Sequence, residues 1–355
     1  MKALWFGTYD RAHPRNRQAM SCLRRAGVEV VERHRGVWGR HNWSAGPGRL
    51  ARLARAELGL ARHVEETADV LVVGYPGHPD IPAARRAARG RPLVFDPLVS
   101  LHDTLVGDRA RFPAGSVAAR ALLRVDRAAL RGADLIVADT AAQARFYTAA
   151  LGVPPGRVEV VLVGAEDALF RPGPRPAHRP FHVLFVGKLT PLHGLDVIVE
   201  AARLAPDVPF RVVGEGQQAA LLRSAPPNVT HVPWVPYQGL AAEYRAAGCA
   251  LGVLGTGQKA ARVIPTKAFQ ALACACPLVT ADTPAARELL TSGRDALLVP
   301  AGDAHALAAA VRALAADTGL AARVGREGRA TYEASASEEV LGRAWRGILE
   351  RALAS

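Results

Sequence analysis

The chain has 355 residues, half of them hydrophobic, and a formal net charge of +13 with a pI near 10.4. A chain of this length divides into two domains more readily than it forms a single core. The positive charge favours an anionic partner: a phosphorylated substrate, an acidic membrane or a nucleic acid. The sequence contains no zinc-finger spacing, RRM-like strand or isolated helix-turn-helix unit, so we expect no nucleic acid among the partners.

The N-terminal stretch MKALWFGTYDR reaches Asp10 and Arg11 before an apolar region develops, and no later stretch approaches the ~20 apolar residues of a membrane span. We therefore expect a cytoplasmic protein without a signal peptide. The cysteines lack CxxC spacing, so small core residues explain them better than a metal site. They are Cys22, Cys249, Cys274 and Cys276.

Short apolar, strand-like runs alternate with helical stretches rich in Ala, Leu and Arg along the whole chain. Such runs are typical of parallel strands whose two sheet faces are both covered. The pattern predicts an α/β protein with two Rossmann-like, doubly wound parallel-sheet domains facing a cleft, where the loops after the strands bind ligands. The predicted strands are 2–6, 28–32, 69–73, 92–95, 134–138 and 158–163 in the first half, and 182–186, 210–213, 229–232, 250–254, 278–280 and 296–299 in the second.

A proline-rich segment separates the two series of strands. Residues 170–180 contain four prolines, which fit neither a helix interior nor a central strand. We therefore predict an N-terminal domain of residues 1–173 and a C-terminal domain of residues 174–336. The last stretch, 337–355, has apolar positions at three- and four-residue spacing, which predicts an amphipathic helix that packs back on the N-terminal domain.

Lysine is rare in this chain, since only four of its 45 basic residues are lysine. Three of them, Lys188, Lys259 and Lys267, lie in glycine- or proline-marked segments of the second half. A compact ammonium is a good partner for a phosphate oxygen, whereas a guanidinium prefers a planar fork. The alternative is that these three lysines survive by chance on a solvated surface.

The segment GKLTPLHG follows one predicted strand and precedes a predicted helix. Its glycines, Gly187 and Gly194, allow a ligand to approach the backbone, and the helix N-terminus offers amide groups to an anion. Lys188 and His193 add positive charge at the same place. This combination predicts an anion-binding loop.

Two later loops have similar features. VVGEGQ places Glu215 where its carboxylate can accept from a hydroxyl or amine, although an ordinary glycine turn explains this loop equally well. In the loop 254–267, Pro265 suits the first helical turn and Thr266 can cap it, so Lys267 lies near the positive end of the helix dipole. A cation is unfavourable there unless an anion binds nearby, which argues for a diphosphate.

Nine segments carry a resemblance to a known family. In the second half they are GKLTPLHG (187–194), VVGEGQ (212–217), NVTHVPWVPY (228–237), GTGQKAARVIPTKAFQALACACPLVTAD (255–282) and RELLTSGRDALLVPAGD (287–303). In the first half they are GTYDRAHPRNR (7–17), DPLVSLHDT (96–104), ADLIVADT (133–140) and VGAEDALFRP (163–172). With these segments the chain resembles GT-B retaining glycosyltransferases of family 4 over nearly its whole length.

The resemblance implies an enzyme that moves a hexosyl-type sugar from a nucleoside-diphosphate sugar to an acceptor hydroxyl, with retention of anomeric configuration. The C-terminal domain would bind the donor and the N-terminal domain the acceptor. Because the nucleoside diphosphate leaves with developing negative charge, fixed cations matter more than covalent chemistry. No Asp-x-Asp motif occurs, so we expect no metal and no cofactor besides the nucleotide-sugar co-substrate.

The resemblance also assigns donor residues. Lys188 would contact the diphosphate, and His193 fills a position that is usually lysine. The backbone around Trp234 and Val235 would bind the nucleotide base. The predicted stabilisers of the leaving group are Lys188 and Lys267, assisted by Lys259 and His193, and the departing phosphate would take the acceptor proton. The donor site also includes Gly187, Glu215, Val263, Ile264, Pro265 and Thr266.

The chain departs from the family pattern at two positions. The family commonly has two glutamates eight residues apart that hold the donor sugar and the ribose, and these positions are Arg262 and Gln270 here. Gln270 can still hydrogen-bond a ribose hydroxyl, and Arg262 can meet the diphosphate or an acidic sugar. The identity of the donor sugar therefore stays open.

We expect the acceptor to bind to two loops of the N-terminal half. His102 roughly matches a family position that approaches the reacting sugar, and an ordinary surface histidine is the alternative interpretation. Asp126 and Asp139 are interpreted as capping or salt-bridging residues. The predicted acceptor-binding residues are Thr8, Arg15, Asn16 and Arg17 in the first loop, and Ser100 and Asp103, beside His102, in the second.

The stretch 48–63 forms an amphipathic pattern. Its basic side carries Arg49, Arg52, Arg55 and Arg62, its other side is rich in leucine, and Trp38 and Trp43 precede it. A helix packed on the core explains this pattern, and so does peripheral binding to an anionic membrane on the inner face of the cell membrane. Glu57 falls on the apolar side and interrupts the pattern.

Several functions stay open. The acceptor is a cell-envelope glycan or glycolipid in one interpretation and a small soluble metabolite of secondary metabolism in another. Two further hypotheses are a nucleotide-sugar epimerase of the same fold and a catalytically silent basic protein that binds anions. Transfer to an acceptor, isomerised donor or no turnover would separate these classes.

Overall fold

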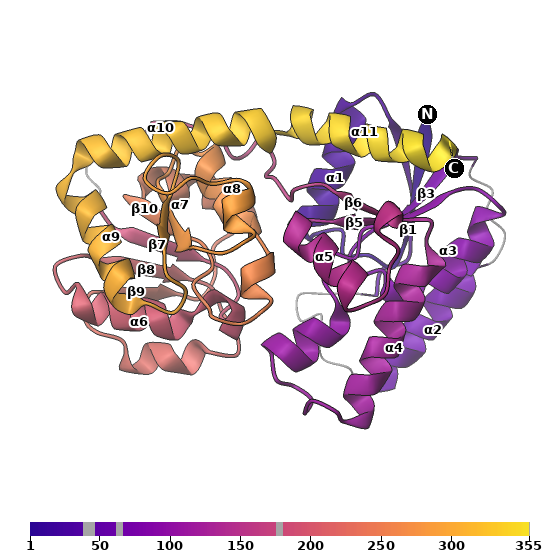
Figure 1. Ribbon diagram of the computed structural model, residues 1–355, viewed down its shortest axis with the longest axis horizontal. Coiled ribbons are helices and arrows are strands. Elements are labelled where there is room, and N and C mark those ends of the chain that lie inside the picture. Colours follow the sequence, from indigo (N-terminus) through magenta and orange to yellow (C-terminus); the bar gives the residue numbers. More distant parts are fainter. Residues whose placement is uncertain (38–46, 62–66, 175–179, 355) are drawn as a thin grey trace. The chain divides into compact units, whose positions relative to one another are not determined.

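The computed structural model describes residues 1–37, 47–61, 67–174 and 180–354 (Figure 1). The chain forms two compact units. The first comprises Met1–Val106, Ala110–Leu162 and Glu338–Ser355, and the second comprises Gly107–Arg109 and Val163–Ser337. Part of the proline-rich segment, residues 175–179, lies outside the described residues.

The first unit contains a parallel six-stranded sheet with the strand order β2-β1-β3-β4-β5-β6. The chain runs outward from β1 to β2 and then crosses to β3 on the other side of β1, which makes the sheet doubly wound. The strands are β1 (Lys2–Gly7), β2 (Glu29–His34), β3 (Val70–Val73), β4 (Leu93–Phe95), β5 (Leu135–Ala138) and β6 (Val158–Val160).

Alternate residues of these strands pack into two different cores, as the period of two of a strand requires. Leu4 and Phe6 of β1 pack with α2, α3, α4 and α5, whereas Trp5 packs with α1 and α11. The helices are α1 (Pro14–Arg25), α2 (Pro47–Ala61), α3 (Ile81–Ala88), α4 (Val117–Gly132), α5 (Ala141–Ala149) and α11 (Glu338–Ala354), with single turns η1 (His78–Asp80), η2 (Asp103–Asp108) and η3 (Pro155–Arg157).

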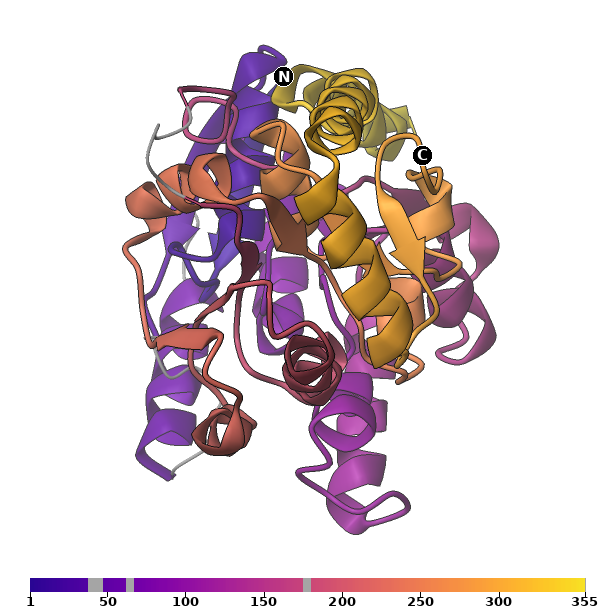
Figure 2. The same ribbon diagram turned by 90° about the vertical axis from the view of Figure 1, so that its left-hand side faces the viewer.

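The second unit has a second parallel six-stranded sheet, with the order β12-β11-β10-β7-β8-β9 (Figure 2). The chain reverses direction across the sheet between β7 and β10, and ligands of doubly wound sheets bind at such a switch point. The strands are β7 (Val183–Val186), β8 (Phe210–Val213), β9 (Val229–Val232), β10 (Cys249–Leu251), β11 (Leu278–Ala281) and β12 (Leu297–Val299).

Helices cover both faces of this second sheet. One face packs against α6 and α9, and the other against α8, which in turn contacts α7 and α10. The helices are α6 (Leu195–Leu204), α7 (Leu240–Ala246), α8 (Thr266–Ala273), α9 (Ala304–Ala316) and α10 (Thr318–Ser335), with short turns η4 (Pro191–His193), η5 (Ala219–Ser224), η6 (Tyr237–Gly239), η7 (Ala260–Arg262) and η8 (Ala286–Glu288).

The predicted fold class is confirmed, because all twelve predicted strands form and pair in two doubly wound parallel sheets. Two strands end three residues earlier than predicted: β6 stops at Val160 rather than residue 163, and β10 stops at Leu251 rather than residue 254. Beyond Leu251 the regular pairing of β10 ends, because the amide of Val253 donates to the Thr280 hydroxyl at 3.1 Å, while its carbonyl accepts from the Ala281 amide at 2.8 Å. No helix among the described residues is long and apolar enough to cross a membrane.

Candidate functional site

Three glycine-rich loops of the second unit meet at the carboxyl ends of β8, β7 and β10. A side chain on Gly214 would collide with the carbonyl of Gly187, and one on Gly216 would come within 2.5 Å of the carbonyl of Leu189. On the other side, a side chain on Gly255 would lie 2.6 Å from the carbonyl of Leu192. These glycines therefore allow the loops to pack backbone to backbone, in addition to any ligand approach.

Lys267, in the first turn of α8, lies at the centre of this arrangement. Its ammonium nitrogen is 3.0 Å from the place where a side chain of Gly187 would begin, and 3.6 Å from the centre of the Phe185 ring. The residue is 6% exposed, and Nζ is buried without a hydrogen-bond partner among the described residues. Desolvation lowers the pKa of Lys267 well below its ordinary value.

The Phe185 ring compensates the charge of Lys267 only in part. A cation over an aromatic face gains about 2 kcal/mol when desolvated, whereas removing an ammonium from water costs several kcal/mol. Desolvation therefore outweighs the ring, and the surroundings of Nζ within the protein disfavour the charged amine. An anion beside Nζ would reverse this balance.

His193 ends the turn η4 next to Lys267. Its Nε2 is 3.7 Å from the same point above Gly187, and its ring stacks edge-on against Phe185 with centres 5.6 Å apart. Its Nδ1 is buried without a hydrogen-bond partner among the described residues. Burial, followed by the positive charges of Lys267 and Lys259, lowers the pKa of His193 well below its ordinary value. Two nitrogen bases, Lys267 Nζ and His193 Nε2, thus lie beside Gly187, and a positive charge on the lysine disfavours protonation of the histidine.

The other predicted cations differ in exposure. Lys259, which precedes η7, is 8% exposed, whereas Lys188 is exposed. Arg262 ends η7 and is partly buried. The buried members, Lys259 and Lys267, are therefore better placed than Lys188 to act where water is excluded.

Gln270 occupies one of the two positions where the family glutamates are missing. It is 4% exposed, and its Oε1 accepts a hydrogen bond of 3.0 Å from the hydroxyl of Tyr244. Since the oxygen of the amide is engaged by Tyr244, the amide NH2 is the part of Gln270 left to meet a ligand. The sequence did not indicate this tyrosine, which lies on α7.

The predicted base-binding segment follows β9, two strands away from β7. Trp234 is 60% exposed, and Val235 packs near Gly239. Glu215 lies between these strands with an exposed side chain, and its carbonyl accepts from the amide of Leu189 at 2.9 Å. At the usual strand spacing this segment lies roughly 10 Å from the carboxyl end of β7.

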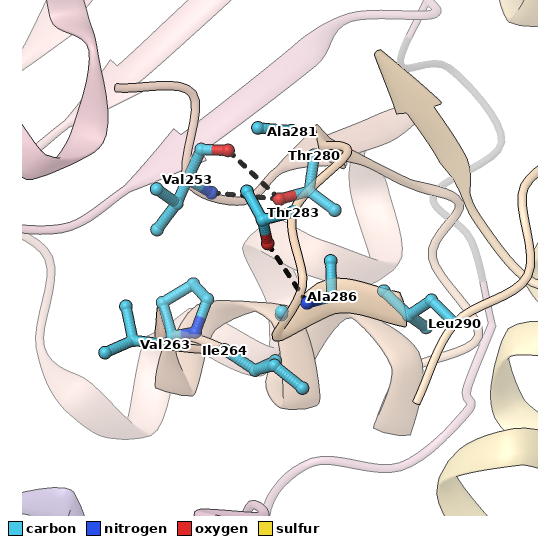
Figure 3. A pocket seen from close by; sticks show the side chains of 10 residues that line it. Val253, Val263, Ile264, Thr280, Ala281, Thr283, Ala286 and Leu290 are labelled. Atoms are coloured by element: carbon cyan, nitrogen blue, oxygen red, sulfur yellow. Dashed lines mark hydrogen bonds between the residues drawn. The ribbon is translucent and has the colours of Figure 1, made fainter. Parts of the chain in front are cut away.

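Val263, Ile264 and Pro265 line a small apolar recess (Figure 3). Its other walls include Thr280 and Thr283, and Figure 3 shows the Thr283 hydroxyl accepting from the amide of Ala286 at 3.0 Å. The cavity holds about 10 Å³, which is enough for about one water molecule and too small for a sugar. These three residues thus contribute packing that positions Thr266 and Lys267 at the start of α8.

In the first unit, three of the four predicted acceptor residues of the first loop are buried and already paired. The amide and hydroxyl of Thr8 both donate to the Asp80 carboxylate at 2.7 Å. Arg15 is fully buried and forms a bidentate pair with Asp96 through Nε at 2.7 Å and Nη2 at 3.2 Å. Asn16 donates to the Tyr75 carbonyl at 2.6 Å and accepts from its amide at 3.0 Å.

These partners favour a structural role for Thr8, Arg15 and Asn16, because groups already satisfied inside the protein have little left to offer an acceptor. Arg15 also donates to the carbonyl of Leu162 at 2.8 Å, which ties α1 to the end of β6. Arg17, further along α1, is only partly buried. It is the member of this set whose position suits ligand binding best.

The second predicted acceptor loop is held by Asp126 of α4. The carboxylate accepts from the Ser100 hydroxyl at 2.6 Å, from the amides of Leu101 and His102 at 2.8 and 2.9 Å, and lies 3.3 Å from His78 Nε2. The Ser100 hydroxyl in turn accepts from the Asp103 amide. The interpretation of Asp126 as a structural carboxylate agrees with these contacts, and His102 is left partly exposed on a fixed loop.

Phe185 is a residue of the site that sequence reasoning missed. It lies two positions before Gly187, and residues two apart in an extended chain point to the same side. The alternation of β7 therefore contained a signal that an aromatic side chain would lie beside Gly187. Among the described residues, no group of three or more His, Cys, Asp or Glu side chains is arranged to hold a metal ion.

Comparison with known proteins agrees with this architecture. The sequence model of the family described as glycosyl transferases group 1 matches residues 180–317, and that of the glycosyl transferase 4-like domain matches residues 7–164. Among solved structures, sucrose-phosphate synthase from Thermosynechococcus elongatus has a TM-score of 0.77 at 19% identity, covering 100% of this chain and 99% of that one. Anabaena HepE in complex with UDP-glucose has a TM-score of 0.73 at 17% identity, covering 99% and 100%.

Two curated relatives share more of the sequence. D-inositol 3-phosphate glycosyltransferase from Geodermatophilus obscurus is 31% identical over 332 residues, which cover 81% of this chain and 70% of the relative. D-inositol 3-phosphate glycosyltransferase 1 from Catenulispora acidiphila is 28% identical over 295 residues, covering 75% and 66%. The match thus spans about two thirds of each relative's own length.

Two doubly wound parallel sheets of this kind define the GT-B class of glycosyltransferase folds. Within that class, the chain belongs to the group 1 glycosyltransferases, also called family 4.

Proposed function

We propose that this protein transfers a sugar from a nucleoside-diphosphate sugar to an acceptor hydroxyl, with the donor bound at the switch point between β7 and β10. The observation that carries the proposal is the buried Nζ of Lys267, which has no hydrogen-bond partner among the described residues and lies beside Gly187 and His193. A buried cation without a counter-ion is costly unless a ligand supplies the negative charge. A diphosphate supplies it.

The direction of the bound donor follows from the loops. The diphosphate lies at Lys267, Lys259 and His193, and the nucleoside extends across the Glu215 loop towards Trp234 at the end of β9. HepE, which shares the fold, was solved with UDP and with UDP-glucose, which supports this class of donor. Because Gln270 and Arg262 replace two carboxylates, the site presents amide and guanidinium donors to the sugar and ribose.

The chemistry in this proposal is electrostatic. The bond between the anomeric carbon and the diphosphate oxygen breaks, a bond from that carbon to the acceptor oxygen forms, and the acceptor proton passes to the departing phosphate. Lys267 and Lys259, with Lys188 at the surface, stabilise the charge that develops on the leaving group. The configuration of the anomeric carbon is retained, and no divalent cation is needed because the lysines supply the positive charge.

The acceptor binds to the first unit, where Arg17, His102 and Asp103 are the predicted residues that remain at least partly exposed. We favour a glycan or glycolipid of the cell envelope, since the basic first unit suits work at the inner face of an anionic membrane. A small soluble metabolite is the alternative acceptor.

A thermal-shift series with UDP, GDP, ADP and dTDP at equal concentrations tests the donor site. One diphosphate should raise the unfolding temperature clearly more than its monophosphate does, since a ligand that binds only the folded state stabilises it. Lys267→Met should abolish the difference between diphosphate and monophosphate. No shift with any of the four would overturn the donor assignment.

The metal-free part is tested in the same preparation by following release of the nucleoside diphosphate in EDTA. Activity that disappears in EDTA and returns with Mg²⁺ would contradict it. Analysis of the products by NMR separates transfer with retention from transfer with inversion, and an isomerised free donor would indicate an epimerase instead.

A further inference from the structure

The helices α2, α3 and α4 form one layer over a face of the first unit's sheet, with α3 in contact with both neighbours (Figure 1). They contain three, two and four arginines, nine in all, and only two acidic residues, Glu57 and Asp126. The outer surface of this layer, which we call the arginine layer, is therefore strongly basic.

Neither acidic residue offsets the charge of the arginine layer. Asp126 is 0% exposed, and its carboxylate is used by the Ser100 loop. Both carboxylate oxygens of Glu57 are buried, and burial together with the nearby Asp80 raises the pKa of Glu57 to about 10. The Glu57 carboxyl is thus turned away from the surface of the layer, in agreement with its place on the apolar side of α2.

Most arginines of this layer whose side chains the structure describes have no ion pair. Arg85 forms an ion pair of 2.8 Å with Asp134, and Arg127 donates to the carbonyl of Ala150. The remaining exposed arginines form no ion pair or side-chain hydrogen bond with any other described residue. They are Arg52 and Arg55 on α2, Arg86 on α3, and Arg120, Arg124 and Arg131 on α4.

The helices on the opposite face of the same sheet behave differently. On α11, Arg343 pairs with Glu339 at 2.6 Å and Arg346 with Glu350 at 2.8 Å. Arg25 of α1 pairs with Glu338 at 2.7 Å. The positive surface is therefore a local property of the arginine layer and does not follow from the arginine content of the whole chain.

Exposed apolar side chains accompany the arginines. Leu58 on α2 is 67% exposed, and Val117 and Val125 on α4 are 75% and 42% exposed. Arginines combined with exposed aliphatic side chains on helices suit the headgroup region of a bilayer, where both kinds of group are satisfied. A soluble polyanion would neutralise the arginines and leave the aliphatic side chains in water.

We propose that the arginine layer is the surface by which the enzyme docks on a bilayer containing anionic phospholipid. The proposal rests on the proposed function in one respect, because docking here serves a lipid-linked acceptor. The link is structural: Asp126, on the buried side of α4, fixes the loop that carries His102, while the opposite side of α4 carries Arg120 and Arg124. The same helix thus connects the membrane surface to the predicted acceptor loop.

The arginine layer differs from the membrane-binding surface that the sequence suggested at residues 48–63. Of that stretch, Arg52 and Arg55 are exposed and belong to the arginine layer. Trp38, Trp43 and Arg62 lie outside the described residues, as does the side chain of Arg49. Half of the six exposed arginines without an ion pair to another described residue lie on α4, which the sequence pattern did not single out.

Co-sedimentation with vesicles tests the proposal. The wild-type protein should pellet with vesicles of phosphatidylcholine and phosphatidylglycerol, remain in the supernatant with phosphatidylcholine alone, and dissociate at high salt. Arg120→Glu/Arg124→Glu should lower the bound fraction by about tenfold. The matched control, Arg343→Glu/Arg346→Glu on α11, changes the net charge equally and should bind like the wild type.

Three results would overturn the proposal: no binding to anionic vesicles, equal loss in the α4 and α11 variants, or complete displacement by dextran sulfate with no effect of Leu58→Asp. The last result would indicate a soluble polyanion. Thermal shift with the nucleoside diphosphate on the same samples keeps the two proposals apart. A protein that binds the nucleotide but not vesicles disproves only the docking surface, whereas failure to bind any nucleotide disproves the proposed donor site.

Discussion

The predicted donor site and the predicted acceptor loops both contain buried polar residues, but these residues are satisfied in different ways. In the first unit, Arg15 has Asp96 and Asn16 has the backbone of Tyr75 as partners. In the second unit, Lys267 is also buried, yet its ammonium has no hydrogen-bond partner among the described residues. A buried guanidinium that has a carboxylate partner stabilises the fold, whereas a buried ammonium without one is a candidate site for an anionic ligand.

The largest change in the free energy of unfolding is expected when the Arg15–Asp96 pair is removed. Arg15→Met leaves the Asp96 carboxylate buried without its partner, which should lower the free energy of unfolding by about 3–5 kcal/mol. Urea denaturation followed by circular dichroism measures this loss. Arg17→Met, two positions along α1 and only partly buried, is the matched control and should change stability little. Equal small effects would show that the pair is not structural.

The contrast also shows what the sequence could and could not predict. The strands follow from local apolar runs, so β1 through β12 form where the sequence indicated them. The loops that contain Lys188, Lys259 and Lys267 follow from glycines and prolines beside those strands. Partners far along the chain follow from neither: Asp96 is 81 residues from Arg15, and no local pattern links them.

Because long-range partners are not visible in the sequence, the sequence predicts acceptor-binding residues in the first loop after β1. A polar residue after a strand faces a ligand in one structure and the interior in another, and the choice depends on long-range partners such as Asp80 for Thr8. The exposure of Lys188 and the pairing of Gln270 with Tyr244 also depend on tertiary packing. The cation set of the donor site could be predicted, but its division into buried and exposed members could not.

The second largest expected effect is the change of nucleotide affinity with pH. Burial lowers the pKa of Lys267 in the protein without nucleotide, and a bound diphosphate should raise that pKa again. Between the lowered pKa of Lys267 in the free protein and its higher pKa in the complex, binding takes up a proton, so affinity falls as the pH rises through this window. The expected slope approaches a tenfold loss per pH unit, or about 1.4 kcal/mol.

Calorimetry in two buffers with different ionisation enthalpies measures this proton uptake directly. The apparent binding enthalpy should differ between the buffers for the wild type and should differ less for Lys267→Met. Identical enthalpies for the wild type in both buffers would mean that no proton is exchanged, which would contradict the expected change in the protonation of Lys267.

A smaller effect is expected from Tyr244→Phe. The change removes the donor to Gln270 Oε1 and keeps the ring, so the free energy of unfolding should fall by about 1 kcal/mol. Because the amide of Gln270 then loses its fixed orientation, nucleotide affinity should fall by a similar or smaller amount. Chemical denaturation and calorimetry on Tyr244→Phe measure the two changes. If Gln270→Ala binds the nucleotide more weakly than Tyr244→Phe does, the amide of Gln270 itself contacts the ligand.

The most direct test of the contrast combines stability and binding for Lys267→Met. This variant should unfold at the same or a higher urea concentration than the wild type, because methionine removes an uncompensated buried amine and keeps its volume. Its affinity for the preferred nucleoside diphosphate, measured by calorimetry, should fall about 10- to 150-fold, the equivalent of one charge-assisted hydrogen bond. A variant that is clearly less stable and binds the diphosphate as tightly as the wild type would contradict the central claim that this lysine is buried for a ligand.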